Sequence, residues 1–259
     1  MSFPDDRGPK DSMMSLLEKE PVSVIINVYN EAQTIEREIL DIHSGILSRL
    51  PGSELIVAED GSTDGTREII TKFVRDFGVI HSTGSQRKGY AKALKDALRI
   101  ARNPYIFFSD TGGKFDFDDF WKLYAMRHPY ALIIGVREKR QDQFYRRVLT
   151  FGYNFLLTYY FHVPLRDADS GFRILRRDLA QKICREEWLN QYLINSELTL
   201  RAIFSGYPVG YVCVAYRKRG GPSRGLPPRE TVRAVAHVLK NFPILKSVLS
   251  APSYPCGSA

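Results

Sequence analysis

The stretch Tyr105-Ile-Phe-Phe-Ser-Asp-Thr-Gly-Gly-Lys114 decides how the rest of the chain is interpreted. It begins with four apolar or aromatic residues after a proline, which predicts a strand that is buried on both faces. It ends in an acid, two glycines and a lysine, so Asp110 is expected at the carboxyl end of that strand. In open α/β sheets this is the edge at which ligands bind.

Strand and helix patterns alternate on both sides of this stretch. The β-branched run Val22–Val28 and the run Leu55–Ala58 predict buried strands, and each is followed by an amphipathic helix. Such alternation is typical of a parallel sheet with right-handed crossovers. We therefore predict an α/β fold in which helices flank a mostly parallel, Rossmann-like sheet. Further strands are predicted near residues 79–80, 130–136 and 209–216.

Length and composition indicate one domain. The 259 residues can bury one sizeable core, and no linker is long enough to divide them. We predict an N-terminal arm over residues 1–20, a domain over residues 21–250 and a tail over residues 251–259. Three widely spaced cysteines support neither a disulfide framework nor a zinc cluster, which indicates a cytoplasmic setting. No secretory signal pattern is present at the start.

The net charge of +8 favours anionic partners, such as nucleotides, phosphorylated substrates or acidic lipid headgroups. Nucleic-acid binding would rest on this charge alone, so we do not predict it. The weakly charged aromatic stretch Val148–Leu165 barely reaches membrane thickness and contains Pro164. Two interpretations stay open for it, a core helix or a helix that lies at a membrane interface.

Three predicted strands release polar groups where they end. These are Tyr29-Asn-Glu31, Glu59-Asp60 and Ser109-Asp110, and in a parallel sheet such ends lie side by side. One acid at a strand end is often only a helix cap, but three in succession indicate a binding edge. The first strand is followed by no glycine fingerprint, which argues against a dinucleotide oxidoreductase.

The motifs of both halves resemble one known family. In the first half, the segments at 24–31, 58–66, 87–91 and 107–110 are similar to those of the inverting, nucleotide-sugar-dependent glycosyltransferases of family 2, which have the GT-A fold. In the second half, the segments at 167–177, 195–198 and 221–224 resemble the branch of dolichyl-phosphate mannose and polyprenyl-phosphate glucose synthases. The resemblance covers residues 21–242 and implies that residues 21–136 bind the nucleotide sugar and residues 137–250 the acceptor.

The resemblance also implies how the donor is held. Tyr29, Glu31 and Asp60 would bind the base and ribose of a nucleoside diphosphate sugar, because carboxylates accept hydrogen bonds from base N–H groups and ribose hydroxyls. Lys88 would lie by the base or the phosphates. Arg224, on a glycine-flanked basic loop, would close over the diphosphate.

The chain departs from the family at the stretch quoted first. Family members usually have Asp-x-Asp followed by Gly-Gln, whose acids bind Mg²⁺ or Mn²⁺, whereas here Gly112 replaces the second aspartate and Lys114 the glutamine. Either Asp110 still binds a metal ion, or Lys114 neutralises the leaving diphosphate. The loss of a carboxylate and the gain of an ammonium weaken the metal site, so metal independence is favoured.

For the acceptor, the resemblance implies a polyprenyl phosphate. Asp167 and Asp169 are catalytic candidates together with Asp110, and Arg137 and Arg146 would face the acceptor phosphate. The arginines at 173, 176 and 177 are expected near a solvated face.

Two alternatives stay open: the same donor chemistry with a soluble hydroxyl acceptor, or nucleotide-sugar binding without turnover. A lipid acceptor would place the chain at the cytoplasmic face of a membrane, through peripheral contact or a membrane partner.

Overall fold

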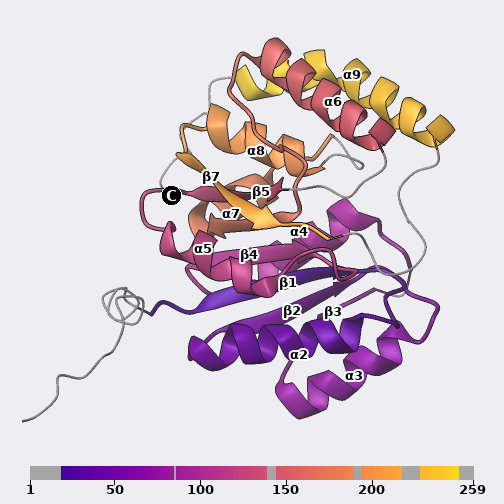
Figure 1. The fold of residues 1–259 in the computed structure, drawn as a ribbon, viewed down its shortest axis with the longest axis vertical. Coiled ribbons are helices and arrows are strands. Elements are labelled where there is room, and N and C mark those ends of the chain that lie inside the picture. Colours follow the sequence, from indigo (N-terminus) through magenta and orange to yellow (C-terminus); the bar gives the residue numbers. More distant parts are fainter. Residues whose placement is uncertain (1–18, 85, 139–143, 190–193, 218–227, 251–259) are drawn as a thin grey trace, which may run out of the picture.

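A computed structural model of the chain describes residues 19–84, 86–138, 144–189, 194–217 and 228–250, with the backbone alone at 144–147 and 228–235. The predicted tail and all but two residues of the predicted arm lie outside these ranges. Within them, the chain folds as one α/β domain (Figure 1).

The described strands form one seven-stranded sheet in the order β3-β2-β1-β4-β6-β5-β7. Strand β6 is antiparallel to β4 and β5, and the other neighbours are parallel. The predicted mostly parallel sheet is thus confirmed. It runs without a break across residue 136, where the two functional halves were predicted to meet. The strands are β1 (Val22–Val28), β2 (Glu54–Glu59), β3 (Ile80–Ser82), β4 (Tyr105–Asp110), β5 (Leu132–Glu138), β6 (Phe172–Arg176) and β7 (Val209–Ala215).

Helices cover both faces of the sheet, and the two-residue period of the strands divides the core between them. In β1, Val24 and Ile26 pack toward α2, α3 and α5, whereas Ile25 packs toward α4, α7 and α8. The first layer consists of α2 (Ile35–Gly45), α3 (Thr66–Phe77) and α5 (Phe120–Ala125), with short 3-10 turns at Leu47–Arg49 and Phe117–Asp119. The second consists of α4 (Tyr90–Ile100), α7 (Arg177–Arg185) and α8 (Ile194–Phe204).

Two further helices, α6 (Phe144–Phe161) and α9 (Pro228–Ser250), lie outside the second layer. They run beside each other at the end of the molecule opposite α2 and α3 (Figure 1). Leu157 and Phe161 of α6 pack with Val238 and Phe242 of α9 and with Leu200 of α8. Among the described residues, no helix is both long and apolar enough to cross a bilayer.

Five of the chain segments that meet at one edge of the sheet are important for the site. Strands β1, β2, β4 and β5 all end there, and β6 begins there because it runs in the opposite direction. Ser109 near the end of β4 pairs with Phe172 at the start of β6, so residues 167–171 return to the side of Asp110. Described site residues from both halves, such as Asp110 and Asp167, therefore lie along this edge.

Candidate active site

Asp110 is fixed between two segments at the end of β4. Its carboxylate Oδ1 accepts a hydrogen bond of 2.9 Å from the Tyr90 hydroxyl at the start of α4, and its N–H donates to the Gly171 carbonyl at 2.9 Å. A Cβ atom on Gly171 would lie 2.3 Å from the Asp110 Cγ, which no real side chain tolerates. Position 171 therefore requires glycine for the carboxylate to stay where it is.

The loop after Asp110 is anchored by an acid from another element. Glu38, buried on α2, accepts the N–H groups of Gly112 at 2.8 Å and of Gly113 at 2.5 Å on one oxygen, Oε1. Both glycines have positive φ values, 96° and 66°, which residues with a Cβ rarely adopt. The Lys114 carbonyl accepts the Arg217 N–H at 2.8 Å, so both ends of the loop are held.

Asp60, at the end of β2, organises the turn that leads into α4. Its Oδ1 accepts the N–H groups of Lys88 at 2.7 Å and Gly89 at 2.8 Å. The Arg87 guanidinium lies 3.5 Å from Asp60 Oδ2, measured at Nε, and 4.1 Å from the centre of the Tyr29 ring. The structure thus brings two predicted donor-binding residues, Tyr29 and Asp60, together around one arginine.

Two other predicted donor residues lie beside this group. Glu31 is 5% exposed, and its N–H donates to Thr66 Oγ1 at 2.8 Å while its Oε2 accepts from the Thr34 hydroxyl at 3.2 Å. The Lys88 ammonium forms an ion pair of 2.8 Å with Asp96 on α4. The roles of Glu31 and Lys88 in donor binding stay predictions.

Asp167, which has a positive φ of 46°, forms a buried ion pair with Arg137 at the end of β5. Its Oδ2 accepts from Arg137 Nε at 2.8 Å and from the Arg137 backbone N–H at 3.0 Å, and its Oδ1 accepts from the same guanidinium. These hydrogen bonds fix the Arg137 guanidinium in one orientation. The pair therefore places a guanidinium at the site.

Asp169, two residues further, has a different environment. Burial raises its pKa from an ordinary value of 3.8 to about 7, and the nearby Asp110 carboxylate adds to the rise although Arg137 and Arg173 oppose it. Asp169 can therefore exchange a proton near neutral pH. The structure thus gives Asp167 and Asp169 different environments, which the sequence motif alone could not show.

Arg173 was expected near a solvated face, and this prediction was wrong. Its side chain is buried because β6 lies inside the sheet, between β4 and β5. The guanidinium donates to the carbonyls of Ala168 at 2.5 Å, Ser170 at 2.6 Å and Asn195 at 2.8 Å, and to Thr199 Oγ1 at 2.8 Å. It therefore fixes the turn at 167–171 against α8.

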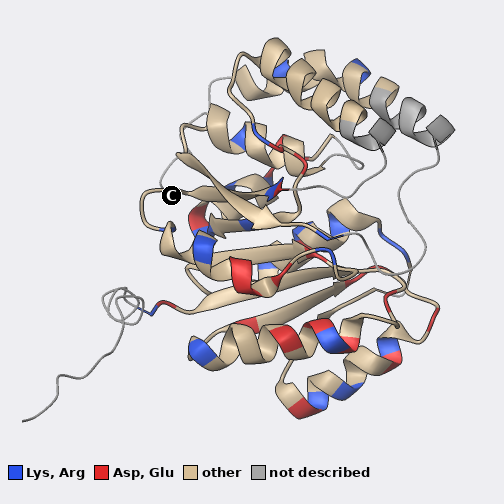
Figure 2. Cartoon of the chain, in the orientation of Figure 1, with Lys and Arg blue, Asp and Glu red and all other residues tan. Residues whose placement is uncertain are grey.

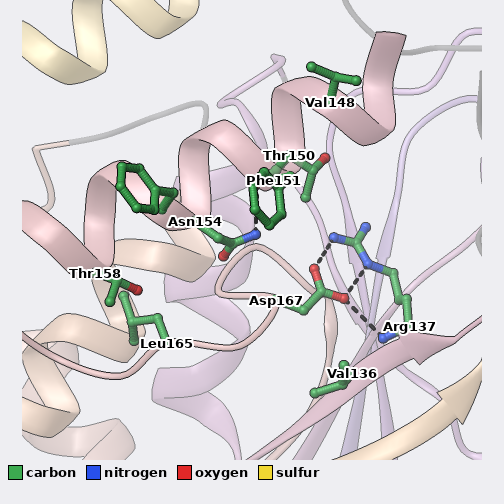
Figure 3. A pocket seen from close by; sticks show the side chains of 10 residues that line it. Val136, Arg137, Val148, Thr150, Phe151, Asn154, Thr158, Leu165 and Asp167 are labelled. Carbon is green, nitrogen blue, oxygen red and sulfur yellow. Dashed lines mark hydrogen bonds and ion pairs between the residues drawn. The ribbon is translucent and has the colours of Figure 1, made fainter. Parts of the chain in front are cut away.

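An open pocket of about 690 Å³ leads from α6 to the ion pair. Figure 3 shows the side chains of α6 along one wall and the Arg137–Asp167 pair at one end. Asn154 connects α6 to the turn that contains Asp167, because its Oδ1 accepts the Ala168 N–H at 3.0 Å. The pocket is lined mainly by apolar groups, from Val136, Arg137, Val148, Thr150, Phe151, Asn154, Phe155, Thr158, Leu165 and Asp167.

Comparison with known families agrees with this architecture. The sequence pattern of Glycosyl transferase family 2 matches residues 23–184, which is more than half of the chain. The chain belongs to this family. The prediction of a family 2 glycosyltransferase is thus confirmed, and with it the class of enzyme.

Relatives of the transferase extend the match. It is 28% identical to the glycosyltransferase AglD of Haloferax volcanii over 238 residues, which cover 85% of this chain but only 36% of AglD. It is 24% identical to the human dolichyl-phosphate beta-glucosyltransferase over 242 residues, which cover 85% of this chain and 75% of that protein.

The fold is shared with a solved structure. Glucosyl-3-phosphoglycerate synthase from Mycobacterium tuberculosis, in complex with Mn²⁺, uridine diphosphate and glucosyl-3-phosphoglycerate, superimposes with a TM-score of 0.65 at 18% identity, over 93% of this chain and 87% of that one. The GT-A-like fold predicted for the transferase is confirmed by this similarity.

Two predicted site residues of the transferase lie wholly or partly outside the described part of the chain. Arg224 lies outside the described residues, and Arg146 lies on α6 with its side chain outside them. Among the side chains that are described, no three His, Cys, Asp or Glu residues are grouped so that they could hold a metal ion. Asp110 as a metal ligand stays a prediction.

Sequence reasoning missed Glu38, Tyr90 and the buried role of Arg173. For Glu38 a signal existed, because it shares the buried face of an amphipathic helix with Ile35 and Ile39, where a charge needs a partner. Tyr90 carries no such signal, since it begins a helix and its target, Asp110, lies twenty residues away at the end of a strand. Only the tertiary structure brings it to Asp110.

Proposed function

We propose that this transferase moves a sugar from a nucleoside diphosphate sugar, linked to UDP or GDP, to a polyprenyl phosphate. The observation that carries the proposal is the pocket along α6, whose apolar walls end at the Arg137–Asp167 pair. A lipid phosphate needs both parts, an apolar channel for its chain and a fixed cation for its head.

The donor is assigned to the edge formed by β1, β2 and β4. Tyr29 and Asp60 lie there on either side of Arg87, and Glu31 is close to them in the chain. An aromatic ring and carboxylates suit a nucleoside, because the ring can stack on a base and the acids accept from ribose hydroxyls. Asp110, at the end of β4, would then face the diphosphate end.

The acceptor is assigned to the α6 pocket. An isoprenoid chain would cover Val148, Phe151 and Phe155, and its phosphate would reach the Arg137 guanidinium. A guanidinium has five N–H donors, of which Asp167 takes two, so one arginine can hold a carboxylate and a phosphate together. The dolichyl-phosphate beta-glucosyltransferases among the relatives support this class of acceptor.

The chemistry follows from these positions. An oxygen of the acceptor phosphate attacks the anomeric carbon from the face opposite the diphosphate, the bond from that carbon to the diphosphate oxygen breaks, and the configuration inverts. A phosphate is already an anion, so it needs no general base. Asp167 would orient Arg137 rather than take a proton.

A membrane contact fits the same helices. On α6, Phe151, Phe155 and Tyr159 are 76%, 61% and 70% exposed, and they share one face at a spacing of four residues. Neither residues 144–165 nor residues 231–250 include an acid, and both segments include basic residues. In Figure 2 this end of the molecule is largely uncharged, in contrast to α2 and α3. We assign it to peripheral contact with anionic lipid.

Substitution of the pocket tests the acceptor. Phe155→Ser opens the apolar wall, so KM for a long polyprenyl phosphate should rise about tenfold while KM for the donor stays the same. Phe77→Ser on α3, which is also exposed, is the matched control and should change neither. Equal effects of both variants on the acceptor KM would contradict the assignment.

A hydroxyl acceptor is the second candidate, and the pKa of about 7 at Asp169 is the observation in its favour. A hydroxyl must lose a proton as it attacks, and a carboxylate with this pKa could accept it. Asp169→Asn separates the two candidates. It should abolish transfer to a hydroxyl but leave most of the transfer to a lipid phosphate.

A further inference from the structure

We propose that the donor site of this transferase works without a divalent cation, with Lys114 as the positive charge on the diphosphate and with Tyr90 and Glu38 as positioning residues. The inference rests on the proposed donor. It explains three residues that a metal site would not need, and each of them makes a specific contact at the end of β4.

Tyr90 binds the carboxylate that would be the first ligand of a cation. Its hydroxyl donates to Asp110 Oδ1 at 2.9 Å, which presents a hydrogen to the oxygen that would otherwise face a metal ion. On the other side, Gly171 lies so close that a Cβ there would meet both Asp110 oxygens, at 2.4 and 2.5 Å. The carboxylate is therefore held by protein groups on two sides.

Glu38 holds the loop at the position where the family has its second aspartate. Where the family pattern has an aspartate, Gly112 has a φ of 96°, and its N–H together with that of Gly113 is bound by Glu38 Oε1. An aspartate at 112 would be strained at this φ, and its carboxylate would lie in a loop already held by another acid. The loop is built around glycine and an internal carboxylate, and this geometry does not suit a second metal ligand.

The carboxylates that remain at the end of β4 do not fit a divalent cation. Mg²⁺ is bound in such sites by one or two carboxylates together with substrate phosphates and water. Here Asp110 is shared with Tyr90, and within the described ranges no group of three acids, histidines or cysteines is present. The neighbouring Asp169 lies beside the cationic Arg137 and Arg173, so these two carboxylates make a weak site for such an ion.

Lys114 supplies the charge that the diphosphate requires. It follows Gly113 directly, and its carbonyl is fixed by the Arg217 N–H, so the backbone of this lysine is anchored at the site. With the residues that the structure describes, its ammonium forms no ion pair and is available to an anion. Lysine binds phosphate as a point charge, which is the electrostatic role that a cation would otherwise have.

Nucleotide binding by the full chain tests this inference independently of turnover. Calorimetric titration with UDP, GDP, UMP and GMP in EDTA and in excess Mn²⁺ should give diphosphate dissociation constants that agree within about twofold. Lys114→Ala should weaken diphosphate binding about tenfold or more in EDTA and leave monophosphate binding unchanged. Lys72→Ala, an exposed lysine on α3, is the control of equal charge and should have no effect.

A gain of tenfold or more in diphosphate affinity with Mn²⁺ would overturn the inference, as would Lys114→Ala behaving like Lys72→Ala. Tyr90→Phe removes only the hydroxyl and frees Asp110 Oδ1, so this variant should gain Mn²⁺-dependent diphosphate binding that the native chain lacks. No gain would contradict the role of Tyr90. If neither UDP nor GDP binds under any condition, the proposed donor itself is wrong.

Discussion

At the scale of single residues, Asp167 and Asp169 show how environment separates two acids of one motif. Asp167 forms an ion pair with Arg137, whereas burial raises the pKa of Asp169 from an ordinary value of 3.8 to about 7. The structure thus gives one of them an electrostatic role and leaves the other able to carry a proton.

The raised pKa of Asp169 predicts how stability depends on pH. Between about pH 4 and pH 7 the folded state binds a proton that the unfolded state has lost, so this group lowers the free energy of unfolding as pH rises. Asp169→Asn stays neutral throughout. It should stabilise the protein more at pH 8 than at pH 5, by about 2 kcal/mol, as measured by urea unfolding.

Asp178 gives the control of opposite sign. The pKa of its carboxyl is lowered because, although burial raises it, hydrogen bonds from Arg176 and a backbone N–H outweigh that effect. Asp178→Asn should therefore lower stability by the same amount at pH 5 and pH 8, and this loss should shrink only as the pH falls below about 4. If the effect of Asp169→Asn were also the same at pH 5 and pH 8, the pKa assigned to Asp169 would be refuted.

Two glycines allow a matched test of the site at Asp110. Gly171→Ala would push the Asp110 carboxylate aside, so donor turnover should fall at least a hundredfold, while crowding costs about 1–3 kcal/mol of stability. Gly152→Ala meets nothing within 4 Å and lies inside α6, so it should raise stability by about 0.5–1 kcal/mol and leave turnover intact. Rates and unfolding curves for both variants check this.

Normal turnover in a folded Gly171→Ala variant would show that the position of Asp110 is not critical. Of these residues, Asp110 could be predicted because it ends an apolar strand, which is a local signal. The close approach of Gly171 could not be predicted, since it depends on which strand pairs with β4. Arg173 was misplaced for the same reason: a charged residue in a short strand gives no sign that carbonyls of the preceding turn and of a distant helix will surround it.

At the scale of elements, α6 has two faces with different roles. Tyr153, Leu157 and Phe161 are buried, whereas Phe151 and Phe155 are exposed. The sequence left open whether this stretch was a core helix or an interface helix, and the structure contains features of both. Its aromatic residues occur all around the helix, so composition alone could not decide between the two.

The exposed face of α6 predicts membrane binding. Replacement of Phe151, Phe155 and Tyr159 by serine should lower partitioning onto vesicles of phosphatidylglycerol and phosphatidylcholine by about tenfold or more, because each aromatic side chain contributes apolar area. Sedimentation with the vesicles measures this, and the attraction should weaken with salt.

Phe77→Ser provides the control for this measurement, as it removes an exposed aromatic ring from α3 at the other end of the molecule. Unchanged binding of the triple variant would show that this face of α6 does not contact lipid. The acceptor pocket would then need another route of access.

At the scale of the whole molecule, the antiparallel strand β6 is what assembles the site. The alternation of strands and helices predicted the parallel part of the sheet and the common edge of β1, β2 and β4. That β6 would run between β4 and β5 was not evident, because Phe172–Arg176 is a short run in an irregular half of the sequence. Its position joins the donor edge to Arg137 and the α6 pocket.

The same arrangement places the two proposed substrate sites in different parts of the molecule. The proposed donor edge is formed by β1, β2 and β4, whereas the proposed acceptor pocket lies along α6, at the end of the molecule opposite α2 and α3 (Figure 1). Residues 144–165 and 231–250 include basic residues and no acid, and they add to the net charge of +8, which favours an anionic surface. Sugar would thus pass from a nucleotide in water to an acceptor in lipid.

The central claim is sugar transfer to a lipid phosphate, and one measurement tests it most directly. The full chain is incubated with labelled UDP-glucose or GDP-mannose and with a polyprenyl phosphate or the matching polyprenol, and label is counted in the organic extract. We predict transfer to the polyprenyl phosphate, in EDTA as well as in Mn²⁺, and none to the polyprenol. Transfer to the polyprenol alone, or to neither lipid, would contradict the account.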